Sequence, residues 1–251
     1  MFTLFSDSDV VREPREIYPG CVHVPGWLSL EQQRFLVSQF YRWGQPAASD
    51  SVSARGIPPH SPEIFGKKMS VRLTTLGWHW NDYTYQERAP EFENAQPLEV
   101  PAWLQRMGRQ SLAAAFDPQL APSWPGLTGE ALEQWIHSYC PDVALVNYYS
   151  PTATMGMHQD KDESSMPIVS VSLGDSGIFR AGNTEHKNLP YQDVLLASGD
   201  LIVFGGPSRF MFHGVPKILP GTSPAGLDFP NGRINITLRH TGLPHSHTPT
   251  H

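Results

Sequence analysis

The hydrophobic positions in the first part of the chain recur at the spacing of an amphipathic helix. Leu36, Phe40 and Trp43 follow one another at intervals of four and three residues, so their side chains share one helical face. Residues 29–32, Ser-Leu-Glu-Gln, form a capping box, in which the serine and glutamine side chains satisfy two backbone N–H groups at a helix start. The pattern therefore predicts a helix that begins at this box, ends at Gly44 and packs on another element.

Two further helices are predicted before residue 142. The first begins at Pro101, carries Leu104 and Met107 on one face, and ends near Phe116. The second has a weaker pattern and covers residues 130–139. Residues 45–62 are rich in Ser, Ala and Pro, which is typical of a loop.

From residue 142 onward the hydrophobic pattern changes to a period of two. Residues 168–173 and 233–239 alternate between apolar and polar side chains, and shorter apolar runs lie at 201–204 and 210–212. Turns rich in Gly and Pro, such as Gly205-Gly206-Pro207, separate these runs. Many short strands with such turns predict a β-sandwich or double-sheet jelly roll, with the earlier helices against one sheet. The expected fold class is mainly β with flanking helices (α+β).

Length and charge narrow the possible partners. The chain has 251 residues, enough for one large domain or two small ones, and its formal net charge is −6. An acidic chain is not a typical nucleic-acid-binding protein, so contacts to phosphate would need a local patch such as Lys67, Lys68 and Arg72. No run of about 18 apolar residues predicts a membrane helix. The N-terminus lacks a secretory signal pattern, and the two cysteines are expected to be reduced thiols, so we expect a cytoplasmic protein without membrane contact.

Two histidines and one aspartate form a candidate metal site. His158 and Asp160 stand two residues apart and share a face if the segment is a strand, and His213 follows an apolar run at an expected strand end. His23 and His60, like His137, lack such neighbours and are expected to be structural or exposed. Two imidazoles and one carboxylate with open coordination positions suit Fe(II); zinc also accepts these ligands, but a general base at zinc-protease spacing is missing, so iron is favoured.

The last alternating segment is a candidate site for a dicarboxylate. Arg233 and Arg239 stand on its polar face together with Asn235 and Thr237. An exposed edge strand would explain the same alternation. However, residues 145, 147 and 149 also share a strand face shortly before His158, so the two faces could line one cavity. Buried arginines need a charged partner, and 2-oxoglutarate would supply two carboxylates.

These motifs, in this order, resemble the AlkB family of Fe(II)/2-oxoglutarate-dependent dioxygenases, in particular its bacterial alkylated-base repair enzymes. The resemblance implies a double-stranded β-helix (jelly roll) barrel, with iron held by His158, Asp160 and His213 and with O2 as the second co-substrate. It is carried by residues 4–7, 69–71, 76–78, 147–149, 158–163, 167–174, 199–200, 205–206, 208–209, 213–214 and 233–239. It implies that 2-oxoglutarate is bound by Leu145, Asn147, Tyr148, Tyr149, Arg233, Asn235, Thr237 and Arg239, with Arg233 on the distal carboxylate and Arg239 nearer the metal.

The resemblance also implies a division of the chain and a substrate lid. Residues 1–141 would form N-terminal helices and a nucleotide-recognition lid, residues 142–241 the dioxygenase core, and residues 242–251 a flexible tail. The aromatic residues Trp78, Tyr83 and Tyr85 would belong to the lid and hold a flipped base. Asp162 would favour a cationic base, and His186 or Lys187 would contact phosphate. The chain departs from the family in the short spacing from Trp78 to Tyr83, in residues 86–140, and in Phe204, which stands where Trp is frequent.

The implied activity is oxidative demethylation of N-alkylated bases such as 1-methyladenine and 3-methylcytosine in DNA or RNA, coupled to conversion of 2-oxoglutarate to succinate. The expected partner is single-stranded nucleic acid, with double strands left open, and the expected state is a monomer. Two alternatives stay open: the same oxygenase chemistry on a protein side chain or small metabolite, and a non-enzymatic nucleic-acid- or metabolite-binding barrel. The second alternative predicts a broken triad, whereas His158, Asp160 and His213 are all present.

Overall fold

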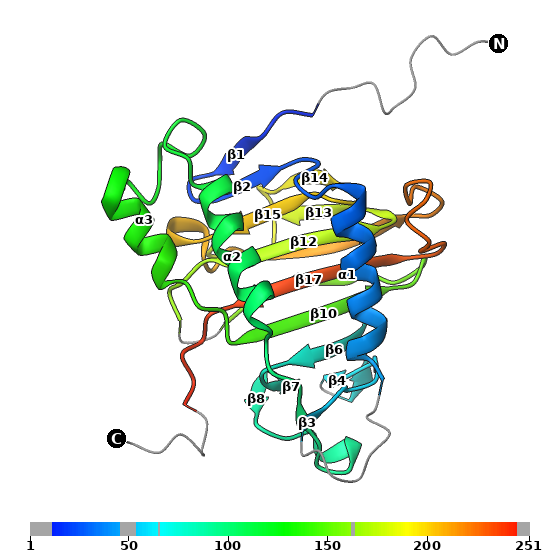
Figure 1. Cartoon of the computed structure of the whole chain (residues 1–251). Coiled ribbons are helices and arrows are strands. Elements are labelled where there is room, and N and C mark those ends of the chain that lie inside the picture. The colour runs from blue at the N-terminus through cyan, green and yellow to red at the C-terminus, as the bar shows by residue number, and fades with distance from the viewer. Residues whose placement is uncertain (1–11, 46–53, 65, 162–163, 245–251) are drawn as a thin grey trace, which may run out of the picture.

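Two antiparallel sheets form the core of the protein (Figure 1). The structure is a computed structural model, and it describes residues 12–45, 54–64, 66–161 and 164–244. The larger sheet contains, in spatial order, β1 (Arg15–Tyr18), β2 (Cys21–Val24), β15 (Leu201–Phe204), β12 (Ile168–Gly174), β17 (Arg233–Arg239), β10 (Val143–Tyr149) and β6 (Arg72–Leu76). The smaller sheet contains β11 (Met155–His158), β16 (His213–Leu219), β13 (Ser176–Ala181) and β14 (Gln192–Leu196).

The eight strands from β10 to β17 pass back and forth between the two sheets. β10, β12, β15 and β17 belong to the larger sheet, and β11, β13, β14 and β16 to the smaller one. This order is that of a double-stranded β-helix, or jelly roll. The mainly β fold with flanking helices that the sequence predicts is therefore confirmed.

Strand alternation decides what each face of the larger sheet meets. On β17, Ile234, Ile236 and Leu238 are fully buried in the main hydrophobic cluster, which also contains Leu36 and Leu104 of the helices. The residues between them face the smaller sheet, and they are polar. One face of the larger sheet is thus apolar and packs against the helices, and the other face lines the interior of the barrel.

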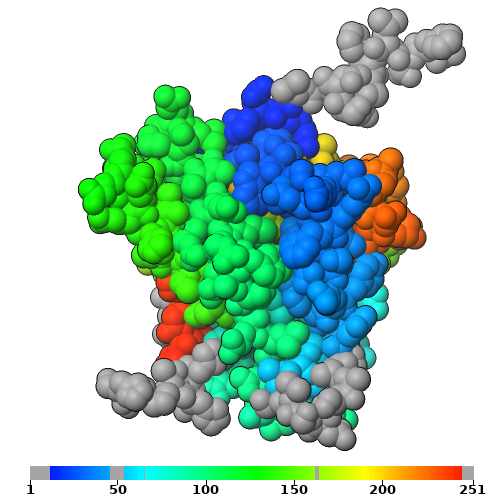
Figure 2. Space-filling view, in the orientation of Figure 1, coloured from blue at the N-terminus to red at the C-terminus, as the bar shows by residue number. Residues whose placement is uncertain are grey.

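The three predicted helices are present: α1 (Leu30–Trp43), α2 (Ala102–Ala115) and α3 (Gly129–Ser138). The capping box of α1 is formed, since the Gln32 backbone N–H donates to Ser29 Oγ (3.2 Å) and the Ser29 N–H donates to Gln32 Oε1 (2.8 Å). Gly44 is the C-cap. α1 and α2 lie across the outer face of the larger sheet (Figure 1), and Figure 2 shows that they cover much of that face. No helix among the described residues is long and apolar enough to cross a membrane.

The N-terminal region also contributes strands, which the sequence did not predict. β2 pairs with β15, and β6 pairs with β10, so residues before 142 form both ends of the larger sheet. Beyond β6 lie three two-stranded pieces, grouped at the lower end of Figure 1. They are β3 (Ala54–Arg55) with β9 (Gln96–Pro97), β4 (Glu63–Ile64) with β5 (Lys67–Lys68), and the hairpin of β7 (His79–Asn81) and β8 (Thr84–Gln86), followed by the short helix η2 (Pro90–Phe92). The division of the chain at residue 141 stays a prediction.

Candidate metal centre and co-substrate cavity

A cavity of about 330 Å³ lies between the two sheets, under the β7–β8 hairpin. Strands of both sheets form its walls. Their inward faces carry polar residues that the sequence analysis selected. Ten of the eleven residues predicted to bind iron or 2-oxoglutarate line it: Leu145, Asn147, Tyr149, His158, Asp160, His213, Arg233, Asn235, Thr237 and Arg239.

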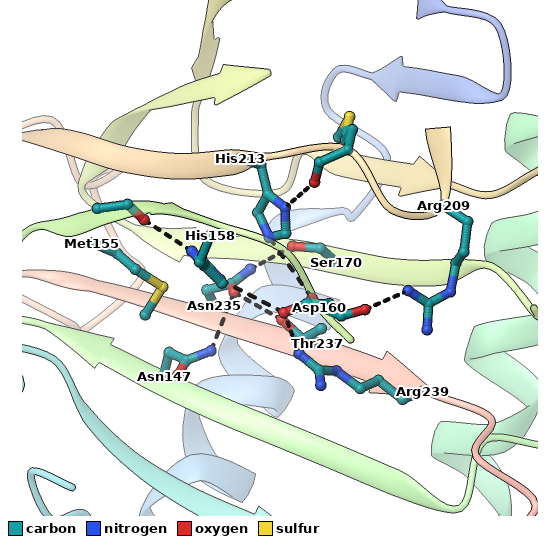
Figure 3. A network of polar contacts seen from close by, with 12 residues as sticks. Asn147, Met155, His158, Asp160, Ser170, Arg209, His213, Asn235, Thr237 and Arg239 are labelled. Carbon is teal, nitrogen blue, oxygen red and sulfur yellow. Dashed lines mark hydrogen bonds and ion pairs between the residues drawn. The ribbon is translucent and has the colours of Figure 1, made fainter. Parts of the chain in front are cut away.

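The three predicted metal ligands converge in this cavity (Figure 3). His158 and His213 are paired across β11 and β16, with ring centroids 4.4 Å apart. His158 Nε2 is 3.6 Å from Asp160 Oδ1, and His213 Nε2 is 3.7 Å from Asp160 Oδ2. One donor atom from each residue lies within 4.8 Å of the other two. Two imidazoles and one carboxylate on one side of a cavity match the facial set that binds non-haem Fe(II) and leaves positions open.

Backbone carbonyls fix the orientation of both imidazoles. His158 Nδ1 is 2.9 Å from the Gly156 carbonyl oxygen, and His213 Nδ1 is 3.2 Å from that of Met211. A carbonyl oxygen only accepts, so each Nδ1 carries a hydrogen and each Nε2, which faces Asp160, is the metal-ligating atom of the neutral ring. The backbone thus orients both rings for a metal.

The strand positions of the ligands differ from the prediction. His158 is the last residue of β11, so Asp160 lies just past the strand, and the two side chains converge through the turn. His213 is the first residue of β16, not the end of a strand. Residues 210–212 form a turn and coil, because the short helix η3 (Gly206–Ser208) at the Gly-Gly-Pro turn interrupts the strand pattern.

Charges around Asp160 keep it ionised. Arg239 Nη2 is 2.6 Å from Asp160 Oδ1, and Arg209 Nη1 donates to the Asp160 backbone carbonyl (2.8 Å). Burial opposes ionisation, but Arg239 and the imidazoles outweigh it and hold the pKa of Asp160 well below its ordinary value. Burial also lowers the pKa of His158, but the hydrogen bond and charge of Asp160 raise it overall. For His213, burial and then the neighbouring His158 lower the pKa to about 4.

Arg233 lies at the opposite end of β17 from the metal ligands and is 1% exposed. Its Nη2 donates to Ser172 Oγ (2.9 Å), and its guanidinium lies 5.2 Å from the centroid of the Tyr149 ring. Its Nε and Nη1 are buried and have no hydrogen-bond partner among the described residues. A buried guanidinium with two unused donors fits a carboxylate ligand, because leaving the charge uncompensated is costly. The site thus fits 2-oxoglutarate, and the separate roles of Arg233 and Arg239 stay a prediction.

Side-chain hydrogen bonds hold the cavity floor between the two arginines. Asn235 Nδ2 donates to Ser170 Oγ (2.6 Å), and Thr237 Oγ1 donates to Asn235 Oδ1 (3.0 Å). Asn147 Nδ2 approaches the same Asn235 oxygen at 3.5 Å (Figure 3). Three neighbouring strands are thereby linked, so the groups that would face a co-substrate are preorganised.

Tyr148 does not face the cavity, so its predicted role in binding 2-oxoglutarate is wrong. Its ring lies on the helix-covered face of the larger sheet, 6.2 Å from Phe40 and 6.2 Å from Phe229 between centroids. Arg72 lies over the ring at 5.0 Å. The physical reason is the strand pleat, which turns residue 148 away from the face shared by its two neighbours.

The lid places a different tryptophan in the cavity from the predicted one. Trp78 is 6% exposed, packs with Val143 and does not line the cavity. Trp80, Tyr83 and Tyr85 do line it. The Tyr85 hydroxyl accepts a hydrogen bond from Arg239 Nη1 (2.6 Å), which connects the lid to the metal-binding side. No local pattern separates Trp80 from Trp78: Trp80 lies in β7, whereas Trp78 precedes that strand and follows Gly77, whose φ is +79°.

The predicted phosphate-contacting residues lie at the cavity mouth. His186 and Lys187 line a second depression of about 760 Å³, which shares His158 and Lys161 with the first cavity. Lys67, Lys68 and Arg72 line neither. The predicted contact of Asp162, like residues 4–7 and 245–251, lies outside the described residues. Phe204 lines the cavity, with its ring centroid 5.0 Å from that of His213.

Comparisons with known proteins agree with this geometry. A family model described as the 2OG-Fe(II) oxygenase superfamily matches residues 20–239. The chain is 38% identical over 250 residues to the alpha-ketoglutarate-dependent dioxygenase AlkB of Escherichia coli (strain K12), covering 96% of this chain and 99% of that protein. It is 34% identical over 240 residues to an AlkB homolog of Caulobacter vibrioides, covering 92% and 91%. The solved structure of OsALKBH1 aligns with a TM-score of 0.73 and 30% identity, over 90% of this chain and 100% of that one. The chain therefore belongs to the AlkB family of the 2OG-Fe(II) oxygenase superfamily and is an Fe(II)- and 2-oxoglutarate-dependent dioxygenase.

Proposed function

We propose that this dioxygenase removes N-linked alkyl groups from bases of DNA or RNA. The observation that carries the proposal is the aromatic hairpin, in which Trp80, Tyr83 and Tyr85 line the cavity that also contains the metal ligands. Planar bases stack on aromatic rings and can be flipped into such a pocket. Among the relatives, one from Arabidopsis thaliana is named a DNA N(6)-methyladenine demethylase and one from Schizosaccharomyces pombe a tRNA demethylase.

The chain's own residues would position three partners. His158, Asp160 and His213 would hold the iron, which supplies the O2-dependent oxidation coupled to conversion of 2-oxoglutarate to succinate and CO2. Arg233 would bind a carboxylate of 2-oxoglutarate, and Arg239 keeps Asp160 ionised and in place. An N-methyl group gains one oxygen atom, and the resulting hydroxymethyl group leaves as formaldehyde, so the base regains its hydrogen.

Local charge at the mouth supports nucleic acid as the partner. Lys161, His186 and Lys187 gather around the second depression, with Glu185 as the acidic residue among them, although the whole chain has a net charge of −6. Such a patch would hold phosphates near the flipped nucleotide. We further propose a single-stranded substrate, because extruding a base costs least there, and a monomeric cytoplasmic enzyme.

The proposed preference for a positively charged base involves Asp162, which lies outside the described residues. Asp160 is the acidic residue among the described cavity-lining residues, and Arg239 neutralises it. A preference for cationic 1-methyladenine or 3-methylcytosine over neutral N6-methyladenine would draw on Asp162, as the sequence analysis expects. Trp80 would take the stacking role first assigned to Trp78.

The experiment is anaerobic reconstitution with Fe(II) and 2-oxoglutarate, followed by O2 and mass spectrometry of a pool of methylated oligonucleotides. The pool carries 1-methyladenine, 3-methylcytosine and N6-methyladenine in single and double strands. We expect loss of base methyl groups with matching succinate and formaldehyde. Succinate formation driven by a protein or metabolite, with every methylated base intact, would contradict the proposal.

Two variants connect that activity to the lid. Trp80→Ala should weaken oligonucleotide turnover by the equivalent of about 1–3 kcal/mol, the value of one base–aromatic stack. Its slow succinate formation without substrate should stay close to that of the wild type. Tyr41→Ala is the matched control, because Tyr41 is an exposed aromatic residue of α1 and does not line the cavity. Equal turnover by the Trp80→Ala and Tyr41→Ala variants would remove the lid from the substrate site.

A further inference from the structure

A second group of metal-ligating side chains lies behind the lid, outside the dioxygenase cavity. It consists of His60, His79 and Glu91. His60 pairs through its backbone with Leu73 of β6 (3.1 and 2.8 Å), His79 begins β7, and Glu91 lies in η2. Among the described residues, this group and the dioxygenase triad are the two sets of three potential ligands whose donor atoms lie within 4.8 Å of one another.

The three side chains converge on one carboxylate oxygen. His79 Nε2 is 2.7 Å from Glu91 Oε1, and His60 Nε2 is 3.8 Å from the same oxygen. The two imidazole ring centroids are 5.7 Å apart, and the rings are 27° from parallel. The His79 side chain is fully buried, that of His60 is 18% exposed and that of Glu91 37% exposed, so the group has one side open to solvent.

A hydrogen bond between His79 and Glu91 explains two of the three residues but leaves His60 unexplained. His60 Nδ1 is 3.1 Å from the Pro58 carbonyl oxygen, so Nδ1 carries the hydrogen and Nε2 presents a lone pair. That Nε2 is buried, and it has no hydrogen-bond partner among the described residues. A nitrogen lone pair 3.8 Å from a carboxylate oxygen is an unfavourable contact, which a cation bound between the two atoms would relieve.

The ligand types indicate which cation fits. Two imidazole nitrogens and one carboxylate oxygen suit zinc and its transition-metal neighbours, whereas Mg²⁺ and Ca²⁺ prefer oxygen ligands alone. The two nitrogen–oxygen distances, 2.7 and 3.8 Å, lie on either side of the spacing of about 3.4 Å between ligand atoms of a tetrahedral zinc site with metal–ligand distances of about 2.0–2.2 Å. The fourth position would face solvent on the side of Glu91.

We propose that His60, His79 and Glu91 bind a second divalent ion of the zinc type, which clamps the segments that carry the lid. The ligands come from the segment paired with β6, from the first residue of β7 and from η2. Trp80 follows His79 directly and lines the cavity. An ion here fixes the base of the β7–β8 hairpin and limits the positions that its aromatic residues can take. This site is independent of the proposed function.

The test measures zinc binding after the first site has been disabled. Asp160→Ala removes the shared carboxylate of the dioxygenase triad. In this background, Zn²⁺ titration against a chromophoric chelator should show one tightly bound ion per chain. Adding Glu91→Gln should weaken that ion at least about tenfold, the lower bound for loss of even an outer-shell partner. The amide oxygen of Gln still accepts from His79, so the hydrogen bond is kept. Histidines elsewhere in the chain are identical in both variants and cancel in the comparison.

Matched controls separate the site from general surface binding. Glu93→Gln removes a neighbouring carboxylate that is 84% exposed, and it should leave zinc binding unchanged. His60→Asn keeps a donor near the position of Nδ1 and lacks Nε2, so it should weaken binding like Glu91→Gln. Zn²⁺ should also raise the Tm of Asp160→Ala and slow proteolysis of the segment around residue 83, and neither effect should survive in the Asp160→Ala/His60→Asn chain.

Two results would overturn the proposal. One is the same zinc affinity in Asp160→Ala with and without Glu91→Gln or His60→Asn. The other is the absence of a tight ion from Asp160→Ala itself. Neither result affects demethylation, which depends on the other triad. If Glu91→Gln unfolds, His60→Asn decides alone, because His60 Nε2 makes no hydrogen bond to the described residues that could be lost.

Discussion

Replacing Arg233 with Met should preserve or raise the stability of the ligand-free protein and, at the same time, weaken binding of 2-oxoglutarate. The wild-type guanidinium is buried, and of its donors Nη2 has a partner in Ser172, whereas Nε and Nη1 have none among the described residues. Each buried donor left unsatisfied costs about 1–3 kcal/mol, more than the single hydrogen bond that Met would forfeit. Metal-free and co-substrate-free Arg233→Met should therefore be at least as stable as the wild type in urea unfolding.

The same change should raise the 2-oxoglutarate requirement. Loss of one partner of a desolvated charge pair costs about 2–5 kcal/mol. Since about 1.4 kcal/mol corresponds to a factor of ten, the apparent KM for 2-oxoglutarate should rise roughly 30-fold or more. Succinate formation against 2-oxoglutarate concentration measures it, with the oligonucleotide held at saturation. The Tm increase that 2-oxoglutarate gives the wild type should also disappear.

Arg180→Met is the matched control. Arg180 lies on β13 and pairs with exposed Asp193 (2.7 Å), so its loss should leave the 2-oxoglutarate requirement unchanged. If Arg233→Met kept the wild-type KM and lost several kcal/mol of stability, Arg233 would be a structural cation, and the assignment of a carboxylate to this end of the cavity would be refuted.

Three further predictions follow from contacts described above. Metal affinity of the triad should increase as pH rises through the raised pKa of His158, because the proton on His158, which Asp160 stabilises, must leave before the metal binds. Calorimetry in two buffers should detect the release of this proton, and a constant metal affinity between about pH 5.5 and 8 would contradict the prediction. Gly77→Ala should lower the free energy of unfolding in urea by more than about 1 kcal/mol, because φ at Gly77 is +79° and a Cβ would lie 1.8 Å from the Asp142 carbonyl oxygen. Gly66→Ala is the control, since Gly66 has a φ of +73° and open space around it, so its loss of stability measures backbone strain alone. Tyr85→Phe removes the acceptor of the Arg239 hydrogen bond, worth about 1 kcal/mol, so kcat should fall about fivefold; an unchanged kcat would separate the lid from the metal site.

Local signals were readable from the sequence because their physics is local. The capping box at Ser29 and the glycine at residue 44 determine a helix through contacts within four residues. The alternation along residues 233–239 gave the inward face of β17, and with it Arg233 and Arg239. His158 and Asp160 were found through their spacing, although the strand ends between them.

Other features depend on tertiary contacts and left no local pattern. β1 and β2 have four residues each, too few for an alternation to distinguish a strand from a loop. His60 and Glu91 are far apart in sequence and meet only because β6 and η2 enclose the base of the hairpin, so His60 looked unremarkable. Trp78 and Trp80 are equally aromatic, and only the path of the chain through Gly77 decides which one enters the cavity.

Strands from the N-terminal part of the chain, which is synthesised first, pair with both sides of the barrel strands in the larger sheet. β2 (Cys21–Val24) can pair only after β15 (Leu201–Phe204) has been synthesised, and β6 only after β10. Pairings between such distant segments slow folding, and until they form, the nascent chain exposes unpaired strand edges that attract other chains. A fragment that begins at residue 142 would keep every ligand of the dioxygenase triad but leave β10 and β15 open to intermolecular pairing. Inclusion-body formation by that fragment, and its rescue by co-expressing residues 1–141, is the behaviour this topology dictates.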